Sequence, residues 1–349
     1  MVLEQEIMAL RTSVALHRAD EMMCLQFSGQ DAYELIDWLC PTEFYLRHSQ
    51  MRHTLFLDDQ AAPLADLYVA CHEEDFFLLF EGADRAKLEV HIQTHLPAGN
   101  RTTIINLLDS YQILSLDGPF AWELLAEVLG AEIVGLPYLT FAQLDSLLCF
   151  RAGNTGEYGY YLLVPRSDTA EMENRLVEIG QKFELVSVGL PVLEQCALEN
   201  FFFNIRREGC AGVSPIELQL QWRVSYHKKY VGAEALAQRR QQGASTRLTT
   251  LVADEEISMG DLIYYDEHCI GEVVNAGFSC VRGDWVALAL LKIPYAYPGI
   301  SRYSGEHAGR RFPVRTVTPP VINNRSLHVN PQAHSFVSRS EFNFPSLVA

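Results

Sequence analysis

The segment from Gly153 to Pro165 (GNTGEYGYYLLVP) constrains the fold of this chain more than any other. Gly156 and Gly159 give the backbone the freedom to turn and to let a ligand or a second strand approach closely. Thr155 can hydrogen-bond to the local backbone within such a turn. The apolar run that follows is typical of a buried β-strand. The segment therefore predicts a glycine-containing turn that enters the core as a strand.

Two α+β patterns follow one another before residue 243. In each, apolar strand patterns alternate with amphipathic helix patterns, and no sequence repeat accompanies the similarity. We expect strands or helices, in chain order, at 22–27, 32–39, 54–57, 67–71, 75–80 and 85–95, and again at 111–116, 119–129, 147–151, 160–164 and 170–183. The sequence therefore predicts one region, residues 1–242, made of two related subdomains at approximately 1–105 and 106–242.

The pattern changes after Gly243. Short strands are expected at 248–252, 262–265, 270–276 and 285–291, separated by Gly-Asp and Asp-Glu turns. This spacing is typical of a small β-barrel or sandwich, assigned here to residues 243–316. Residues 317–349 are rich in Pro, Asn and Ser, and we expect an extended tail that wraps over the surface or is ordered by a partner, including a homodimer formed through this tail.

Composition narrows the classes of partner. The chain has 349 residues, of which 48% are hydrophobic, and a net charge of -17. So acidic a chain repels nucleic acid phosphates and anionic membrane surfaces. No apolar run approaches the roughly 20 residues of a membrane span, and no signal or transit peptide is apparent. The eight cysteines lack a C-x-x-C pair, which favours reduced thiols in a cytoplasmic protein.

Residues 153–165 resemble the G-Y-T-G-E-D-G-Y-E-I-x-x-P signature of the glycine-cleavage T-protein family. Other similar segments are 64–69 (I-D-D-L-x-V), 189–200 (G-L-x-A-R-D-x-L-R-L-E-A), 214–217 (T-P-x-E) and 230–236 (F-I-G-x-E-A-L). Together they span roughly residues 10–316, and their order and spacing are specific. The resemblance implies an α+β fold, with a ring of two ferredoxin-like units around a central ligand channel and a C-terminal β-barrel. It also implies an aminomethyltransferase or methyltransferase that uses tetrahydrofolate.

Asp66 falls on the catalytic carboxylate of this family. The resemblance implies that Asp66 stabilises the reacting amine or the cation that develops during one-carbon transfer. A carboxylate that only caps a turn is the alternative. Such chemistry needs no covalent nucleophile, and we recognise no serine or cysteine triad.

Several expected ligand contacts depart from the family pattern. Asn154 replaces a tyrosine, Tyr161 replaces the glutamate that reads the pterin ring, and Leu193 replaces an arginine that helps to hold folate. Glu81 could supply the missing carboxylate from an adjacent strand, or it is a solvated residue before Gly82. Tyr161 could equally be a core tyrosine. The candidate ligand-binding residues are therefore Glu81, Tyr161, Leu193, Glu199 and Trp222, although Trp222 could simply be core.

Other candidates are weaker. His91 and His95 have a spacing that metal ligands can have, but no third ligand is placed near them, so we expect no metal. Arg206 and Arg207 could bind an anionic ligand such as a folyl tail, or form surface salt bridges.

Three hypotheses follow: a tetrahydrofolate-dependent transferase, a binding or assembly factor resembling the iron-sulfur-maturation branch of the family, and a transferase that binds another ligand. Lys229 occupies the position of that branch's cysteine, so its thiol chemistry is lacking. The one-carbon donor, the acceptor and any carrier protein are not specified by the sequence.

Overall fold

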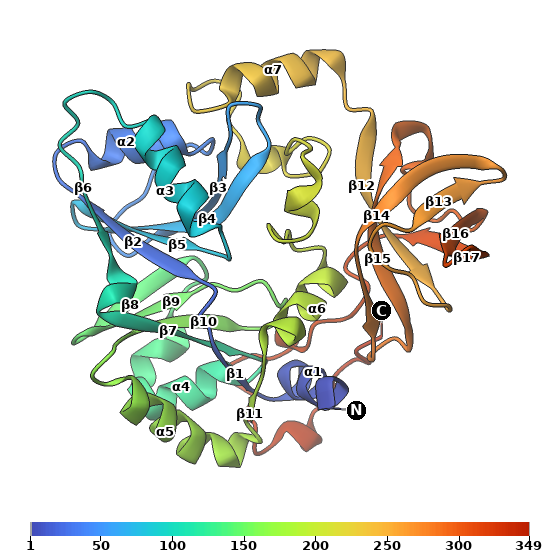
Figure 1. Ribbon diagram of the computed structural model, residues 1–349. Helices are drawn as coiled ribbons and strands as arrows, with labels where there is room; N and C mark the ends of the chain where they lie inside the picture. Colours follow the sequence, from blue (N-terminus) through green and yellow to red (C-terminus); the bar gives the residue numbers. More distant parts are fainter. Residues whose placement is uncertain (1, 349) are drawn as a thin grey trace.

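The computed structural model describes residues 2–348 and shows the expected α+β architecture with a C-terminal barrel (Figure 1). Two open sheets lie face to face, and helices cover the outer face of each sheet. The barrel stands to one side of this layered body. Within residues 2–348, each helix is too short or too polar to cross a lipid bilayer.

The first sheet is antiparallel, with the strand order β3-β4-β5-β2-β6. Its elements are β2 (Met23–Ser28), α2 (Ala32–Leu39), β3 (Met51–Leu57), β4 (Pro63–His72), β5 (Asp75–Phe80), α3 (Arg85–Thr94) and β6 (Thr103–Asn106). Successive residues of β5 point to opposite faces. Phe76, Leu78 and Phe80 pack with α2 and α3, whereas Phe77 and Leu79 face the second sheet. Burial on both faces explains why β5 reads as a continuous apolar run.

The second sheet has the strand order β11-β1-β7-β10-β9-β8. Its elements are β1 (Ala15–Arg18), β7 (Tyr111–Asp117), α4 (Ala121–Leu129), β8 (Thr140–Leu144), β9 (Leu147–Arg151), β10 (Gly159–Pro165), α5 (Thr169–Gly180) and β11 (Val186–Ser187). Tyr160, Leu162 and Val164 of β10 pack with α4 and α5. Tyr161 and Leu163 point the other way, into the space between the sheets.

The predicted boundary of the first subdomain differs from the structure at the N-terminus. Helix α1 (Val2–Thr12) packs against α6 (Leu190–Asn200). Strand β1 then pairs antiparallel with β7 and parallel with β11. Residues 15–18 therefore belong to the second sheet. A four-residue strand gives too short a pattern to reveal such long-range pairing.

The barrel closes in the order β12-β15-β14-β13-β16-β17. Helix α7 and the six strands are α7 (Ala233–Gln242), β12 (Thr246–Ala253), β13 (Leu262–Tyr265), β14 (His268–Ser279), β15 (Asp284–Lys292), β16 (Tyr303–His307) and β17 (Arg310–Val317). The four expected strands are present. We did not predict β16 or β17, since Pro313 and three arginines interrupt the apolar pattern of β17, although Phe312, Val314 and Thr316 are buried.

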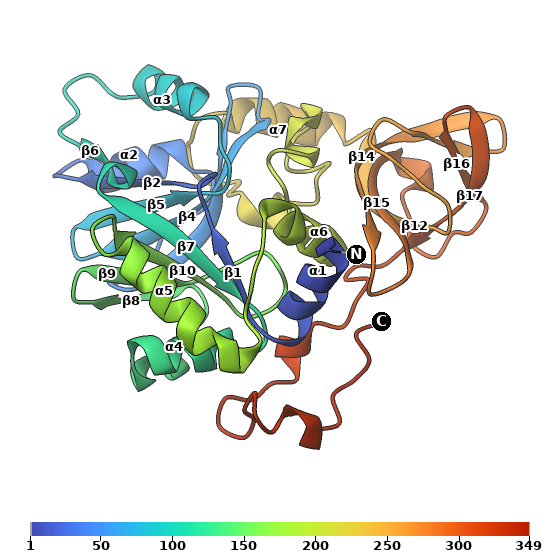
Figure 2. The same ribbon diagram turned by 60° about the horizontal axis from the view of Figure 1, so that its bottom comes forward.

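The tail runs back from the barrel and packs on the helical face of the second sheet (Figure 2). Phe336 is 2% exposed, and its ring lies 5.4 Å from that of Phe120 and 5.6 Å from that of Phe183. Tyr158 donates a hydrogen bond to the Val329 carbonyl. In this structure the tail packs on the surface of its own chain.

Candidate functional site

A pocket lies at the edge of the core between the two sheets, beside α6. The lining residues that matter below are Met22, Glu81, Gly82, Asn154, Tyr161, Leu190, Leu193, Glu194 and Arg206. The empty space in the pocket totals about 400 Å³, part of which is open to solvent. The cavity volume available to the centres of water molecules is only about 20 Å³. A single enclosed water needs about 10–15 Å³ of such volume. A bicyclic ligand can therefore enter only when the walls move.

Glu81 is the buried carboxylate of this pocket. It follows β5, and the alternation that directs Phe77 and Leu79 toward the second sheet directs Glu81 the same way. Tyr161 donates a hydrogen bond to Glu81 Oε1 at 2.8 Å, and Asn154 donates one to Oε2 at 2.6 Å. Burial, and then the charge of Asp66, raise the pKa of Glu81 to about 7. The interpretation of Glu81 as a solvated residue is wrong, since it is 9% exposed.

Two of the departures from the glycine-turn signature converge on Glu81. Asn154 stands where the signature has tyrosine, and Tyr161 stands where it has glutamate. Both side chains donate to the carboxylate of Glu81. The pocket lining therefore has a buried carboxylate at the end of β5 in the first sheet, whereas the signature places its carboxylate on β10 in the second.

Asp66 lies beside Glu81 but is already paired. The Glu81 backbone N–H donates to the Asp66 carbonyl at 2.9 Å. Arg223 Nη1 donates to Asp66 Oδ1 at 2.9 Å, and His53 Nε2 lies 2.7 Å from the same oxygen. Burial alone would raise the pKa of Asp66, but His53 and Arg223 outweigh it and hold the pKa below its ordinary value. Asp66 is thus an ionised carboxylate next to a buried guanidinium, behind the lining of the pocket.

Tyr68 adds a buried hydroxyl to this cluster. Its side chain is fully buried, and its ring stacks on His53 with 4.2 Å between the ring centroids. Among residues 2–348, nothing hydrogen-bonds to Tyr68 Oη. Burial, and then the charge of Glu81, raise the pKa of this phenol well above its ordinary value, so it is neutral. An unpaired buried hydroxyl costs about 1–3 kcal/mol, which a polar ligand atom or a water can offset.

Leu193 and Arg206 form the opposite wall. Leu193, on α6, lines the pocket with an apolar side chain. Arg206 Nε donates to Glu194 Oε1 at 2.9 Å. The guanidinium packs on Gly82 so closely that a Cβ built there would lie 1.5 Å from Nη1. The cation that the family pattern places at Leu193 is thus absent, and another cation reaches the pocket from the segment after α6.

Glu199 and Trp222 lie outside the pocket as the described residues define it. Glu199 is fully buried; Arg11 donates to its Oε2 at 2.7 Å and Ser279 donates to its Oε1 at 2.7 Å. Trp222 is 69% exposed and lies against the guanidinium of Arg223. Its interpretation as a core residue is wrong. The predicted ligand residues that the structure brings together are Glu81, Tyr161 and Leu193.

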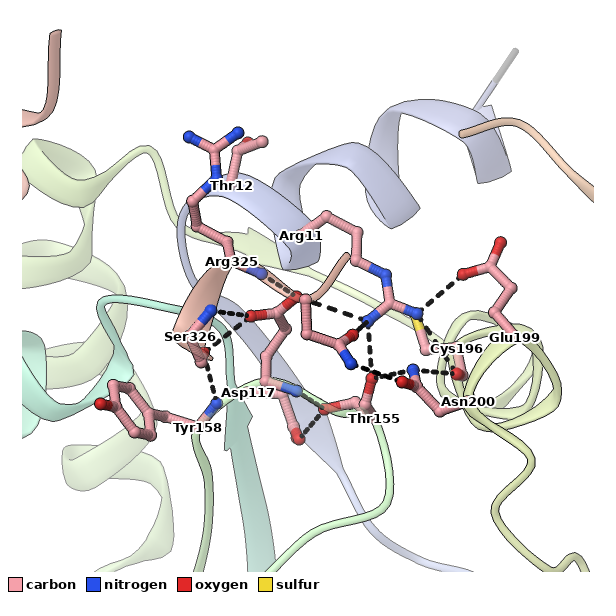
Figure 3. A network of polar contacts seen from close by, with 12 residues as sticks. Arg11, Thr12, Asp117, Thr155, Tyr158, Cys196, Glu199, Asn200, Arg325 and Ser326 are labelled. Carbon is pink, nitrogen blue, oxygen red and sulfur yellow. Dashed lines mark hydrogen bonds and ion pairs between the residues drawn. The ribbon is translucent and has the colours of Figure 1, made fainter. Parts of the chain in front are cut away.

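The glycine turn takes part in a second polar network, centred on Arg11 (Figure 3). Arg11 is fully buried, and its Nη1 donates to the Thr155 carbonyl at 2.6 Å and to Asn324 at 3.0 Å. Glu157 accepts hydrogen bonds from the backbone and the hydroxyl of Ser326, each at 2.7 Å. The network joins α1, the glycine turn, α6 and the tail.

Gly156 shows what the turn must accommodate. Its φ is +84°, and a Cβ built on it would lie 2.5 Å from Asn324 Oδ1 and 2.6 Å from Asn200 Nδ2. The close approach that the glycine permits is therefore made by the tail and by α6. Nothing in the sequence around Arg11 signalled this role.

Comparison with known proteins agrees with the fold and with the arrangement of the sheets. The family model described as the GCVT N-terminal domain matches residues 1–228, and that of the glycine cleavage T-protein C-terminal barrel domain matches residues 246–323. The crystal structure of the glycine cleavage system aminomethyltransferase T from Bartonella henselae superposes with a TM-score of 0.81 at 21% identity, covering 93% of this chain and 90% of that one.

Relatives of similar length support the same grouping. An aminomethyltransferase of Pseudothermotoga lettingae is 26% identical over 83% of this chain and 82% of its own length. An aminomethyltransferase of Exiguobacterium sibiricum is 25% identical over 91% of this chain and 89% of its own length. The residues matched by the two family models include both the glycine turn and the closed barrel. This chain belongs to the glycine cleavage T-protein family, as a divergent member.

Proposed function

We propose that this protein is a cytoplasmic, tetrahydrofolate-dependent one-carbon transferase, moving an aminomethyl or methyl group, in which Glu81 recognises the pterin ring. The observation that carries the proposal is the convergence of Tyr161 and Asn154 on Glu81. The signature has its carboxylate at position 161, whereas this chain has one at Glu81 on the facing sheet. Such an exchange is expected if the pocket still binds the same pair of hydrogen-bond donors. Tyr161 and Asn154 fix the orientation of the Glu81 carboxylate.

The chemistry of the pocket suits a pterin. A pterin presents an amide N–H and an amino group side by side, and a carboxylate accepts such a pair. An ionised carboxylate offers about four lone-pair positions; Tyr161 and Asn154 use two of those on Glu81. Met22, Leu190 and Leu193 supply apolar wall for the faces of a ring. When bound, tetrahydrofolate supplies the nitrogen that carries the one-carbon unit.

Asp66 acts, in this proposal, from behind the lining of the pocket. The stabilisation of a reacting amine or cation by Asp66 stays a prediction. Its carboxylate balances the charge of Arg223, and its own charge helps to keep the proton on Glu81. Glu81 must release that proton to accept two hydrogen bonds, so we expect affinity for the folate to rise with pH up to about 7.

A non-catalytic folate-binding or assembly factor on the same scaffold is the second candidate. The observation that favours it is the ion pair between Asp66 and Arg223, which occupies the carboxylate expected to do the chemistry. Folate binding without transfer from any N-methyl or aminomethyl donor would support this candidate. A transferase that uses another ligand would instead show no folate binding.

Moving the carboxylate from position 81 back to position 161 tests the proposal. Glu81→Asn removes the carboxylate at the end of β5, and Tyr161→Glu places one where the signature has it, so the double variant has a single carboxylate on β10. Each change alone leaves either no carboxylate or two facing carboxylates. We expect each single variant to lose at least tenfold in tetrahydrofolate affinity, the scale of one charge-assisted hydrogen bond, and the double variant to recover most of it. Calorimetric titration measures the affinities, and circular dichroism checks the fold. Additive losses in a folded double variant would refute the assignment of Glu81.

A further inference from the structure

Arg206 is held in place from one side only. Its Nε donates to Glu194 Oε1, and its backbone N–H donates to Asn204 Oδ1 at 2.9 Å. Glu194 also accepts from Arg207 at 3.1 Å. On the other side, Arg206 Nη1 is buried against Gly82 and has no hydrogen-bond partner among residues 2–348. The guanidinium is therefore anchored through Nε, and its Nη1 is a buried donor without an acceptor, on a side chain that lines the pocket.

Charge and depth restrict what this N–H can bind. The described lining of the pocket contains three carboxylates, Glu21, Glu81 and Glu194, and Arg206 is its permanent cation. The Arg206 side chain is 31% exposed, whereas Glu81 is 9% exposed. The carboxylate of Glu81, which accepts hydrogen bonds, thus lies deep in the pocket, and the guanidinium of Arg206 lies nearer to solvent. An elongated ligand with hydrogen-bond donors at one end and an anion at the other matches this order.

We propose that Arg206 binds a carboxylate of the ligand at the mouth of the pocket, and that Gly82 is required to place the guanidinium there. The inference rests on the proposed function, since Glu81 must hold the pterin end. The carboxylate belongs either to the glutamate of the folate or to an amino-acid donor of the one-carbon unit. In either case, Arg206 replaces the cation that the family pattern places at Leu193.

Binding measurements with matched ligands test this inference. Tetrahydrofolate and tetrahydropteroate differ only in the glutamate, so their affinity ratio reports recognition of its carboxylates. We expect Arg206→Met to weaken tetrahydrofolate binding about tenfold and to leave tetrahydropteroate binding unchanged. Gly82→Ala should act in the same direction without removing any charge, because its methyl group displaces the guanidinium. Since the φ of Gly82 is +72° and strains any side chain there, circular dichroism of this variant checks that the fold is kept. Arg207→Met is the matched control, since Arg207 pairs with the same Glu194 but does not line the pocket.

The second source of the carboxylate gives a different result. If the carboxylate is that of the donor, Arg206→Met leaves both pterin affinities unchanged. It then abolishes the thermal shift that N-methylglycine, but not dimethylamine, produces in the presence of tetrahydropteroate. Equal weakening of tetrahydropteroate and tetrahydrofolate, or no change in any of these measurements, overturns the inference and leaves the proposed function standing. Failure of the wild-type protein to bind either pterin refutes both.

Discussion

Replacement of Glu81 by glutamine should stabilise this protein in a pH-dependent manner. The pKa of Glu81 is raised from 4.5 to about 7, first by burial and then by Asp66. A carboxyl group with a raised pKa in the folded state favours folding while it is protonated. Its contribution to stability is therefore present at low pH, falls as the pH rises above about 4.5, and is lost once the pH passes about 7. Glutamine stays neutral throughout and keeps the shape of the side chain.

The size of the effect follows from the two pKa values. At about 1.4 kcal/mol per pH unit, the difference between about 7 and 4.5 corresponds to about 3 kcal/mol. Most of this, about 2.5 kcal/mol, develops between pH 5 and pH 8. The variant should therefore gain about 2.5 kcal/mol over the wild type at pH 8, relative to the difference between them at pH 5. Because the wild type is measured alongside, the other ionisable groups cancel.

Guanidinium unfolding at pH 5 and pH 8 gives the two free energies of unfolding. Glu208→Gln is the control, because burial raises the pKa of Glu208 to about 7 and Glu208 itself does not line the pocket. Its carboxylate accepts hydrogen bonds from Asn275 and from the backbone N–H of Asn204, a lining residue whose backbone N–H the variant leaves in place. Both variants should show the pH-dependent gain, but only Glu81→Gln should lose folate binding. A gain for Glu81→Gln that is the same at both pH values would show that Glu81 ionises normally, and the account of the pocket would be wrong.

Two further predictions concern buried ion pairs. Asp66→Asn leaves the guanidinium of Arg223, which is 4% exposed, without its counter-charge. We therefore expect the free energy of unfolding to fall by about 3–5 kcal/mol. If the variant keeps wild-type stability but loses transfer activity, Asp66 takes part in the chemistry instead. Arg11→Met leaves Glu199 and Glu157 buried without a cation. We expect the free energy of unfolding to fall by a similar amount, and proteolysis of residues 317–349 to become faster. A tail that stays protected from protease would contradict the role of Arg11 in holding it.

The sequence predicts much of the fold because its local patterns agree with the tertiary packing. The bounds of α2, β5, β9 and β13 are the same as their predicted ranges. Two of the elements that sequence analysis missed, β1 and β17, depend on long-range pairing or packing. Strand β1 has four residues and is defined by its pairing with β7, and β17 carries exposed arginines because only one of its faces enters the barrel.

Prediction of the site was limited by the same kind of long-range contact. Glu81, Tyr161 and Leu193 could be proposed because each lies in a recognisable segment. The partner of Asp66 is Arg223, 157 residues away, and no local pattern connects the two. Glu199 matches the family by position, yet its carboxylate faces Arg11, 188 residues away. The identity of a residue could be matched from the sequence, but the direction of its side chain depended on which elements packed against it.

The residues at positions 81 and 161 constrain one another physically, so neither can be understood alone. Glu81 and Tyr161 face the same space from opposite sheets and lie within hydrogen-bonding distance. Two carboxylates there would repel one another in a buried site. A pocket with no carboxylate would leave the hydrogen-bond donors of Tyr161 or of a ligand unpaired. A glutamate gained on the first sheet therefore has to be matched by its loss on the second. Under the proposed function, the cation follows the same rule: Leu193 is apolar where the family pattern has a cation, and Arg206 brings a cation to the pocket lining from another segment.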